Sequence, residues 1–130
     1  MRSILICLLF VGTAAASAAP RYLNLVNDGP RRITAVHSAT PGSNDWQPVS
    51  IMKDGLPGGG DAETLKVDSG ADCLQDLRID FVGSRRLIVR DFNICRYHGL
   101  QAGTAWRLGH AQQRAHTALA SGKDEIGSHP

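Results

Sequence analysis

The sequence lacks an excess of charge of either sign. It contains 14 Lys and Arg against 12 Asp and Glu, and removal of Arg2 with an exported leader leaves 13 against 12. A chain so nearly balanced has no general field that would steer nucleic acid or anionic lipid toward it. The Arg-Arg pairs at 31–32 and 85–86 stand beside turn residues, and we interpret them as solvated turn charges, because nucleic-acid binders usually show a clustered basic face. We expect no nucleic-acid partner.

Long hydrophobic runs are also missing after the first 20 residues, and nothing later approaches the roughly 20 apolar residues of a transmembrane helix. The start has three parts: a positive Met1-Arg2-Ser3, an apolar run at 4–11, and small residues at 14–19. This layout is typical of a secretory signal peptide, and its apolar run is too short to remain in a bilayer as a helix. Cleavage is expected after Ala18. The sequence therefore predicts a signal peptide at 1–18 and a periplasmic or secreted mature protein.

Cysteine is scarce, with three residues in the chain. Cys7 lies inside the apolar part of the leader and is lost with it, which leaves Cys73 and Cys95. An even number of cysteines in an exported chain favours a disulfide over a reactive thiol. With the 21 intervening residues, such a bridge would stabilise the fold by about 3 kcal/mol.

Short alternating segments separated by turns dominate residues 22–98, and they predict an all-β fold, a small antiparallel β-sandwich of five to seven strands. We assign this domain to residues 19–100. Residues 22–27 and 33–37 are expected to form a hairpin around the turn at 27–30. An irregular loop is expected over 38–61. A later strand should point Leu65 and Val67 inward.

The segment between the two cysteines is predicted to be a second hairpin with its turn at Gly83-Ser84. Alternation places Leu77, Ile79 and Phe81 on the inner face. The outer face, formed by Asp76, Arg78 and Asp80, is expected to be solvated. Two registers remain open. One centres the turn on Ser84 and sets the cysteines directly opposite each other, and the other, which we favour, has a bulge near Arg90 to Phe92 that moves them off exact opposition.

The last 30 residues differ in character from the rest. Large apolar side chains are few in 101–130, and a weak helix over 108–119 would have a stripe made mostly of alanine. Such a segment buries too little to offset its chain entropy. We expect a flexible tail at 101–130 that is dispensable for folding.

The ordered part resembles a family of small exported bacterial proteins that has no settled function. The resemblance covers residues 22–97 and depends mainly on the two cysteine motifs. Gln75 departs from the family pattern, which usually has an aromatic residue at that position. The resemblance implies an exported β-sandwich and says almost nothing of mechanism. The elements that carry it are Leu25-Val26-Asn27, Ile33-Thr34, Asp45-Trp46, Leu56-Pro57-Gly58, Cys73-Leu74-Gln75-Asp76-Leu77-Arg78 and Phe92-Asn93-Ile94-Cys95.

Residue patterns typical of metal sites are missing. Of the five histidines, His110 and His116 are the nearest pair, six residues apart, whereas ligands on a helix are usually three or four apart. We expect no metal and no cofactor. The remaining histidines are His37, His98 and His129.

Patterns typical of hydrolases are missing too. There is no Gly-x-Ser-x-Gly elbow, and Gly58-Gly59-Gly60 has no following Lys-Ser/Thr. Asp76 and Asp80 would lie ~13 Å apart along a strand, farther than paired glycosidase carboxylates. The sequence therefore predicts a protein that is not an enzyme.

Asp45-Trp46, in a polar loop, is the candidate binding site. An exposed Trp46 could stack on a sugar or anchor a partner, and the alternative is that it folds back to cap the sandwich. We expect a monomeric, non-enzymatic binding or accessory module of the bacterial cell envelope, whose partner is an envelope protein or glycan. It would use the loop face formed by Trp46 and the glycine-rich segment 55–60. The other class left open is a small secreted enzyme or enzyme inhibitor that assembles His37, Asp45 and His98 in space.

Overall fold

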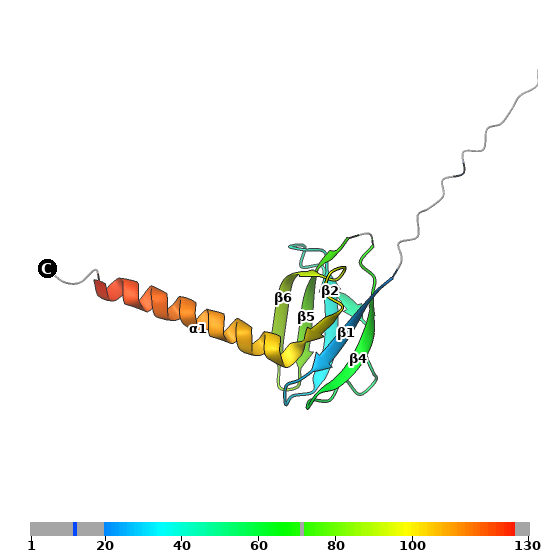
Figure 1. Ribbon diagram of the computed structural model, residues 1–130, viewed down its shortest axis with the longest axis horizontal. Coiled ribbons are helices and arrows are strands. Elements are labelled where there is room, and N and C mark those ends of the chain that lie inside the picture. Colours follow the sequence, from blue (N-terminus) through cyan, green and yellow to red (C-terminus); the bar gives the residue numbers. More distant parts are fainter. Residues whose placement is uncertain (1–11, 13–19, 71, 127–130) are drawn as a thin grey trace, which may run out of the picture.

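The computed structural model describes residues 12, 20–70 and 72–126 (Figure 1). The signal-peptide prediction lies outside these residues, apart from Gly12. The described part forms seven strands and one helix. The strands are β1 (Arg21–Asn27), β2 (Ile33–Ala39), β3 (Gln47–Val49), β4 (Asp61–Val67), β5 (Leu74–Phe81), β6 (Arg85–Asn93) and β7 (Gly99–Gln101), and the helix is α1 (Ala102–Ile126).

The strands form two sheets. One has the order β4-β1-β7 and the other the order β3-β2-β5-β6. A mostly β fold is therefore confirmed. Not all of its pairs are antiparallel, however, since β7 runs parallel to β1 and makes the smaller sheet mixed.

One hydrophobic cluster draws on both sheets. The alternation that pointed Leu65 and Val67 inward is confirmed, since these side chains are 1% and 0% exposed. Leu23 and Leu25 meet them from β1, and Leu77 and Ile79 contribute from β5. Period-two patterning thus identifies the inner face of each sheet.

The expected hairpin of β1 and β2 is not formed. β1 pairs with β4 and β7, whereas β2 pairs with β3 and β5, so the chain crosses between sheets at residues 28–32. Buried Asn27 holds this crossing because its Nδ2 donates to the carbonyls of Arg31 (2.7 Å) and Leu56 (3.0 Å). The expected loop over 38–61 is interrupted by β3.

The hairpin of β5 and β6 forms with a register different from the first one considered. Phe81 faces Arg85 rather than Leu87, so the turn centres on Gly83. The favoured bulge is confirmed: Gln75 faces Phe92 while Leu77 faces Val89, and Asp91 within the bulge has φ 52°.

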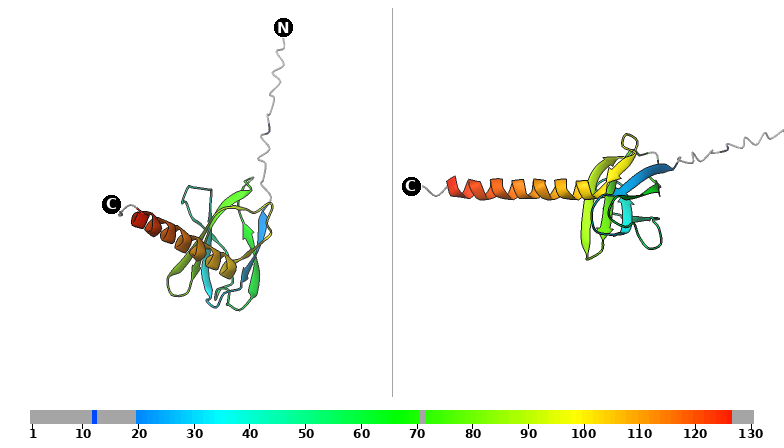
Figure 2. Two further views of the ribbon diagram at one scale, coloured as in Figure 1. Left: turned by 60° about the vertical axis from the view of Figure 1, so that its left-hand side comes forward. Right: turned by 60° about the horizontal axis from the view of Figure 1, so that its bottom comes forward.

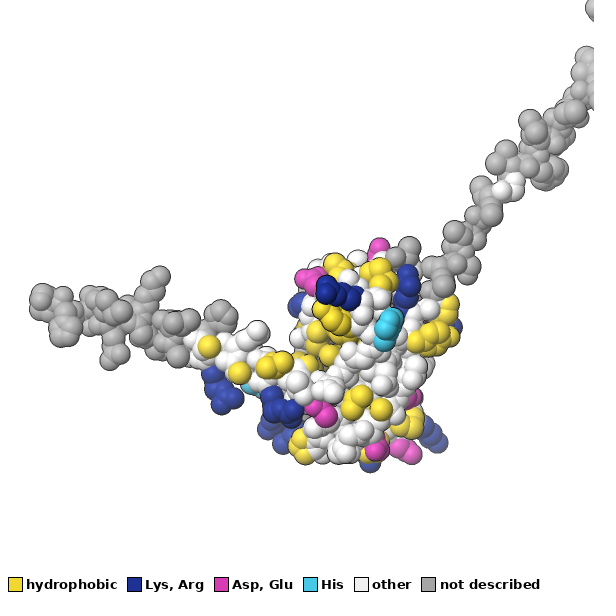
Figure 3. All heavy atoms as spheres, in the orientation of Figure 1, with side chains coloured by type: hydrophobic (Ala, Val, Ile, Leu, Met, Phe, Trp, Pro, Cys, Tyr) yellow, Lys and Arg dark blue, Asp and Glu magenta, His cyan; other side chains and the backbone are white. Residues whose placement is uncertain are grey.

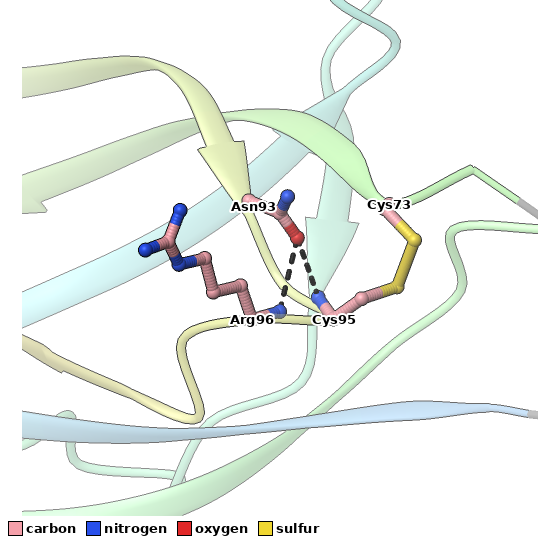
Figure 4. Close-up of a disulfide and its surroundings, with 4 residues drawn as sticks. All are labelled: Cys73, Asn93, Cys95 and Arg96. Atoms are coloured by element: carbon pink, nitrogen blue, oxygen red, sulfur yellow. Dashed lines mark hydrogen bonds between the residues drawn. A yellow bond between two sulfur atoms is a disulfide. The ribbon is translucent and has the colours of Figure 1, made fainter.

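The Cys73–Cys95 disulfide is confirmed and closes the end of this hairpin. The backbone N–H of Ile94, not that of Cys95, donates to the carbonyl of Cys73 at 2.8 Å, so the cysteines are diagonal neighbours. Asn93 shapes the turn after β6, because its Oδ1 accepts from the N–H groups of Cys95 (3.1 Å) and Arg96 (3.0 Å) (Figure 4).

The expectation of a flexible tail over 101–130 is not supported, since residues 102–126 form α1. Alanine, glutamine and arginine are good helix formers even where they supply no apolar stripe. The helix starts against the sheets and then extends away from them (Figure 2). Its 25 residues correspond to about 37 Å. Within the described residues no helix has both the length and the apolarity needed to span a membrane.

Candidate functional site

Trp46, the aromatic residue singled out from the sequence, is partly buried and lies against arginines of its own chain. The guanidinium carbons of Arg78 and Arg90 are 5.5 and 5.6 Å from the centroid of its ring. Cation–π contacts of this kind hold the ring on the outer face of the four-stranded sheet. The ring of Trp46 is therefore partly covered by two arginines of its own chain.

Asp45 lies at the rim of a polar pocket of about 330 Å³. Asp68, Gln75 and several hydroxyl groups also line it, at the end of β2 where Ser38 and Ala39 lie. Asp45 Oδ1 accepts from Gln47 Nε2 at 3.1 Å, so its carboxylate is already engaged.

The glycine-rich segment 55–60 does not lie beside Trp46. Leu56 bridges to Ile33 at the start of β2, whereas Gln47, next to Trp46, pairs with Ser38 near the end of β2. Trp46 and the glycine-rich segment thus lie beside opposite ends of β2. The single loop face expected from the sequence is not formed.

The histidines and Asp45 of the alternative enzyme do not come together. The ring of His37 contacts Arg78 Nη2 at 3.2 Å and lies 3.9 Å from Asp80 Oδ2. Burial, followed by the charge of Arg78, lowers the pKa of His37 below 6.5, so His37 is neutral at pH 7. No hydrogen bond or ion pair among the described residues joins His37, Asp45 and His98.

The described part of the chain also holds no group of three or more His, Cys, Asp or Glu side chains that could bind a metal. His110 has its ring 4.3 Å from that of Trp106. The side chain of His116 and all of His129 lie outside the described residues.

The outer face of β5 is not the solvated row that alternation predicted. Asp76 is 1% exposed and accepts hydrogen bonds from the N–H groups of Gly42 (2.9 Å) and Asp91 (3.0 Å) and from Arg90 Nη1 (2.8 Å). Asp80 and Arg78 are about four-fifths buried. Loop 40–46 and the bulge in β6 supply these partners, and neither contact could be inferred from the alternation of β5.

A second pocket lies where α1 leaves the sheets. It has a volume of about 280 Å³ and is lined by two aromatic residues and three arginines. We call it the arginine–tryptophan pocket. Its lining residues are Gly29, Pro30, Arg31, Phe81, Arg85, Gly103, Trp106 and Arg107.

The sheet register and the helix together assemble this pocket. Ile33 faces Phe81 and Phe81 faces Arg85, so the pairing of β2, β5 and β6 brings the segment containing Arg31 to the start of β6. The ring of Trp106 meets Phe81 edge-on at 5.7 Å. Positive side chains gather below the first turns of α1 (Figure 3).

Asp28 fixes the position of α1, and with it the helical side of the pocket. It caps the helix although it lies 75 residues earlier in the chain. Its carboxylate accepts from the N–H groups of Gly103 (2.6 Å) and Thr104 (3.1 Å) and from the Thr104 hydroxyl (2.6 Å). These N–H groups have no partner within the helix, and a carboxylate at a helix N-terminus is favourable. Burial alone would raise the pKa of Asp28, but these hydrogen bonds outweigh it and the pKa is lowered.

The pocket is positive at neutral pH. No carboxylate lines it, and of its three arginines Arg107 alone has a carboxylate within 4 Å in the described residues, Asp28 at 3.4 Å. Sequence reasoning treated the arginine pairs as separate turn charges. One pair precedes β2 and the other begins β6, and these strands are not neighbours in the sheet. Both strands begin beside the end of β5, a proximity that follows from strand pairing and not from a sequence pattern.

Comparison with known proteins adds no relative: no family model, no curated protein and no solved structure matches this chain.

Proposed function

We propose that this chain is an exported, non-enzymatic binding module that captures an anionic group in the arginine–tryptophan pocket. The supporting observation is the convergence of Arg31, Arg85 and Arg107, from three separate segments, around Phe81 and Trp106. Pockets that combine apolar walls with a few convergent polar groups are the usual form of a ligand site. Guanidinium groups are well suited to carboxylate, sulfate and phosphate.

Export is supported by the disulfide, because such bridges persist in oxidising compartments. The resemblance to small exported bacterial proteins remains a prediction beside it. Binding is favoured over catalysis because the pocket has no nucleophile paired with a base: its polar side chains are arginines. A fixed positive charge binds an anion without transferring a proton, since arginine stays protonated in proteins.

Phenyl phosphate is a suitable probe, since it has one anionic group and one ring. In a Trp46→Phe background Trp106 is the one tryptophan left, so its fluorescence reports on the pocket. We expect saturable quenching by phenyl phosphate and none by benzyl alcohol. Replacing both Arg85 and Arg107 with Gln should weaken binding at least about tenfold, because each charge-assisted contact contributes roughly 1 kcal/mol or more.

Arg96→Gln is the matched control, because Arg96 is exposed and lies over Tyr97, outside the pocket. It should leave the affinity unchanged. If phenyl phosphate does not bind, or binds equally well to the Arg85/Arg107 double variant, the proposal is wrong.

A further inference from the structure

The hollow at the arginine–tryptophan pocket continues along α1. A second hollow of about 820 Å³ shares Arg85, Trp106 and Arg107 with the pocket and extends past His110 to Arg114. A third, on the β6 side, shares Trp106, His110 and Gln113 with the second. The pocket is thus continuous with a shallow, open groove along one side of the first four turns of the helix.

Positive charge is repeated along this groove. Arg107 and Arg114 are seven residues apart, which places them on one face of α1 about 10 Å apart along its axis. Arg31, from the β1–β2 crossing, and Arg85, at the start of β6, line the pocket together with Arg107. No carboxylate lines the second hollow, and in the described part of the chain Arg114 has no carboxylate within 4 Å.

We propose that the occupant is a chain of anionic sugars, such as a sulfated polysaccharide, that runs from the pocket along α1 to Arg114. This inference rests on the proposed function and names the ligand of the same site. A single small anion reaches the arginines at one end only. Arg107 and Arg114, about 10 Å apart, can both be paired only by an anion that carries several negative charges along its length.

The other groups in the groove suit sugar rings. Trp106 and His110 lie edge to face, 4.3 Å apart, and border the hollow. Aromatic faces pack against the C–H faces of sugars, while Gln113 and Thr117 offer hydrogen bonds to hydroxyl groups.

Two other polyanions fit the chain less well. A nucleic-acid binder usually has a broad basic face, whereas the arginines here form one narrow row along the groove. An anionic membrane surface requires a helix with a wide apolar face. Between Arg107 and Ala115, Leu108 is the one large apolar side chain of α1.

The test compares heparin-derived disaccharide and hexasaccharide by calorimetry on the full chain, produced by export so that the disulfide forms. We expect the hexasaccharide to bind at least about tenfold more tightly than the disaccharide, because two contacts made by one linked ligand reinforce each other. Arg114→Gln should weaken hexasaccharide binding about threefold to tenfold and leave phenyl phosphate binding unchanged, and Arg96→Gln should change neither.

The outcomes separate the two proposals. If phenyl phosphate binding depends on Arg85 and Arg107 but the sugars show no length dependence and Arg114→Gln has no effect, the extended ligand is wrong and the pocket stands. If phenyl phosphate and both sugars fail to bind, both proposals are wrong. Tighter binding of single-stranded DNA of equal charge, or of phosphatidylglycerol vesicles, would overturn the assignment to an anionic glycan.

Discussion

Asp76 is the residue whose environment departs furthest from its sequence pattern. It belongs to the polar half of an alternating strand, yet it is 1% exposed and accepts three hydrogen bonds. A buried carboxylate is tolerated only when its oxygens are satisfied. Here it ties loop 40–46 and the bulge of β6 to the centre of the four-stranded sheet.

Asp76→Asn should lower the free energy of unfolding by about 2–3 kcal/mol, because an amide replaces one acceptor oxygen with a donor that faces backbone N–H groups or Arg90. Arg90 is about half exposed, so the ion pair itself contributes little. Urea unfolding at pH 7 measures the change. Asp61→Asn, an exposed position in β4, is the control and should shift stability by less than about 0.5 kcal/mol.

Asp76 should also make the free energy of unfolding depend on pH. Burial raises the pKa of Asp76, but the N–H groups of Asp91 and Gly42 and the guanidinium of Arg90 outweigh it, so the pKa is lowered from 3.8. A lowered pKa in the folded state contributes stability that is present above pH 3.8 and is lost as the pH falls through the folded value. The stability difference between wild type and Asp76→Asn should therefore narrow below pH 3.8. If this difference in unfolding free energy stayed constant below pH 3.8, Asp76 would not be the source of the pH dependence.

At the scale of elements, the N-terminus of α1 is held by close contact with the β1–β2 crossing. Ala102 is 0% exposed, and Asp28 caps the first turn. Gly103 lies so close to the crossing that an added Cβ would be 2.6 Å from the nitrogen of Gly29 and 2.8 Å from the carbonyl carbon of Asp28. Only a residue without a side chain fits there.

Gly103→Ala and Gly109→Ala should therefore have opposite effects, although both add one methyl group to the same helix. Gly103→Ala should destabilise the protein by about 1–3 kcal/mol, because backbone atoms must move. A Cβ at Gly109 meets nothing within 4 Å, so Gly109→Ala should stabilise by up to about 1 kcal/mol. Thermal unfolding, followed by Trp106 fluorescence in the Trp46→Phe background, measures both.

A change of stability in the same direction for both variants would mean that Gly103 is not packed closely against the β1–β2 crossing. An unchanged emission of Trp106 in Gly103→Ala would mean the same, since the displaced helix should expose this ring.

At the scale of the whole molecule, α1 divides into a docked start and an extended remainder. The helix contacts β1, β6 and β7, and its start lies against the sheets, where Trp106 meets Phe81 (Figure 2). The described side chains at 111–115 and at 117 are exposed. The helix is thus part of the fold at one end and presents surface along the rest.

Two truncations should separate these parts. A chain ending at His110 should keep its unfolding free energy within about 1 kcal/mol, because the residues it lacks bury little. A chain ending at Gln101 loses Ala102 and Trp106 and should be less stable by about 2–4 kcal/mol, since Phe81 becomes exposed. Urea unfolding measures both. Equal stability of the two chains would mean that the whole segment after residue 101 is dispensable for folding.

Local patterns in the sequence were sufficient to predict several parts of this protein. Alternation identified the mostly β fold and the inward Leu65 and Val67, and the cysteine count identified the Cys73–Cys95 bridge. The bulge near Arg90 to Phe92 was also predicted, although the expected register centred on Ser84, whereas the observed one centres on Gly83 and sets Leu77 against Val89. Each of these depends on residues within one strand or one hairpin.

Contacts between distant segments determined the rest. The separation of β1 and β2 into two sheets, the burial of Asp76 and the parallel β7 all depend on which strands pair, and alternation is the same for any partner. The start of α1 depends on Asp28, about 75 residues earlier in the chain. The arginine–tryptophan pocket needs the sheet register and the capped helix at once, so its residues carry no shared pattern in sequence. Tertiary structure alone brings them together.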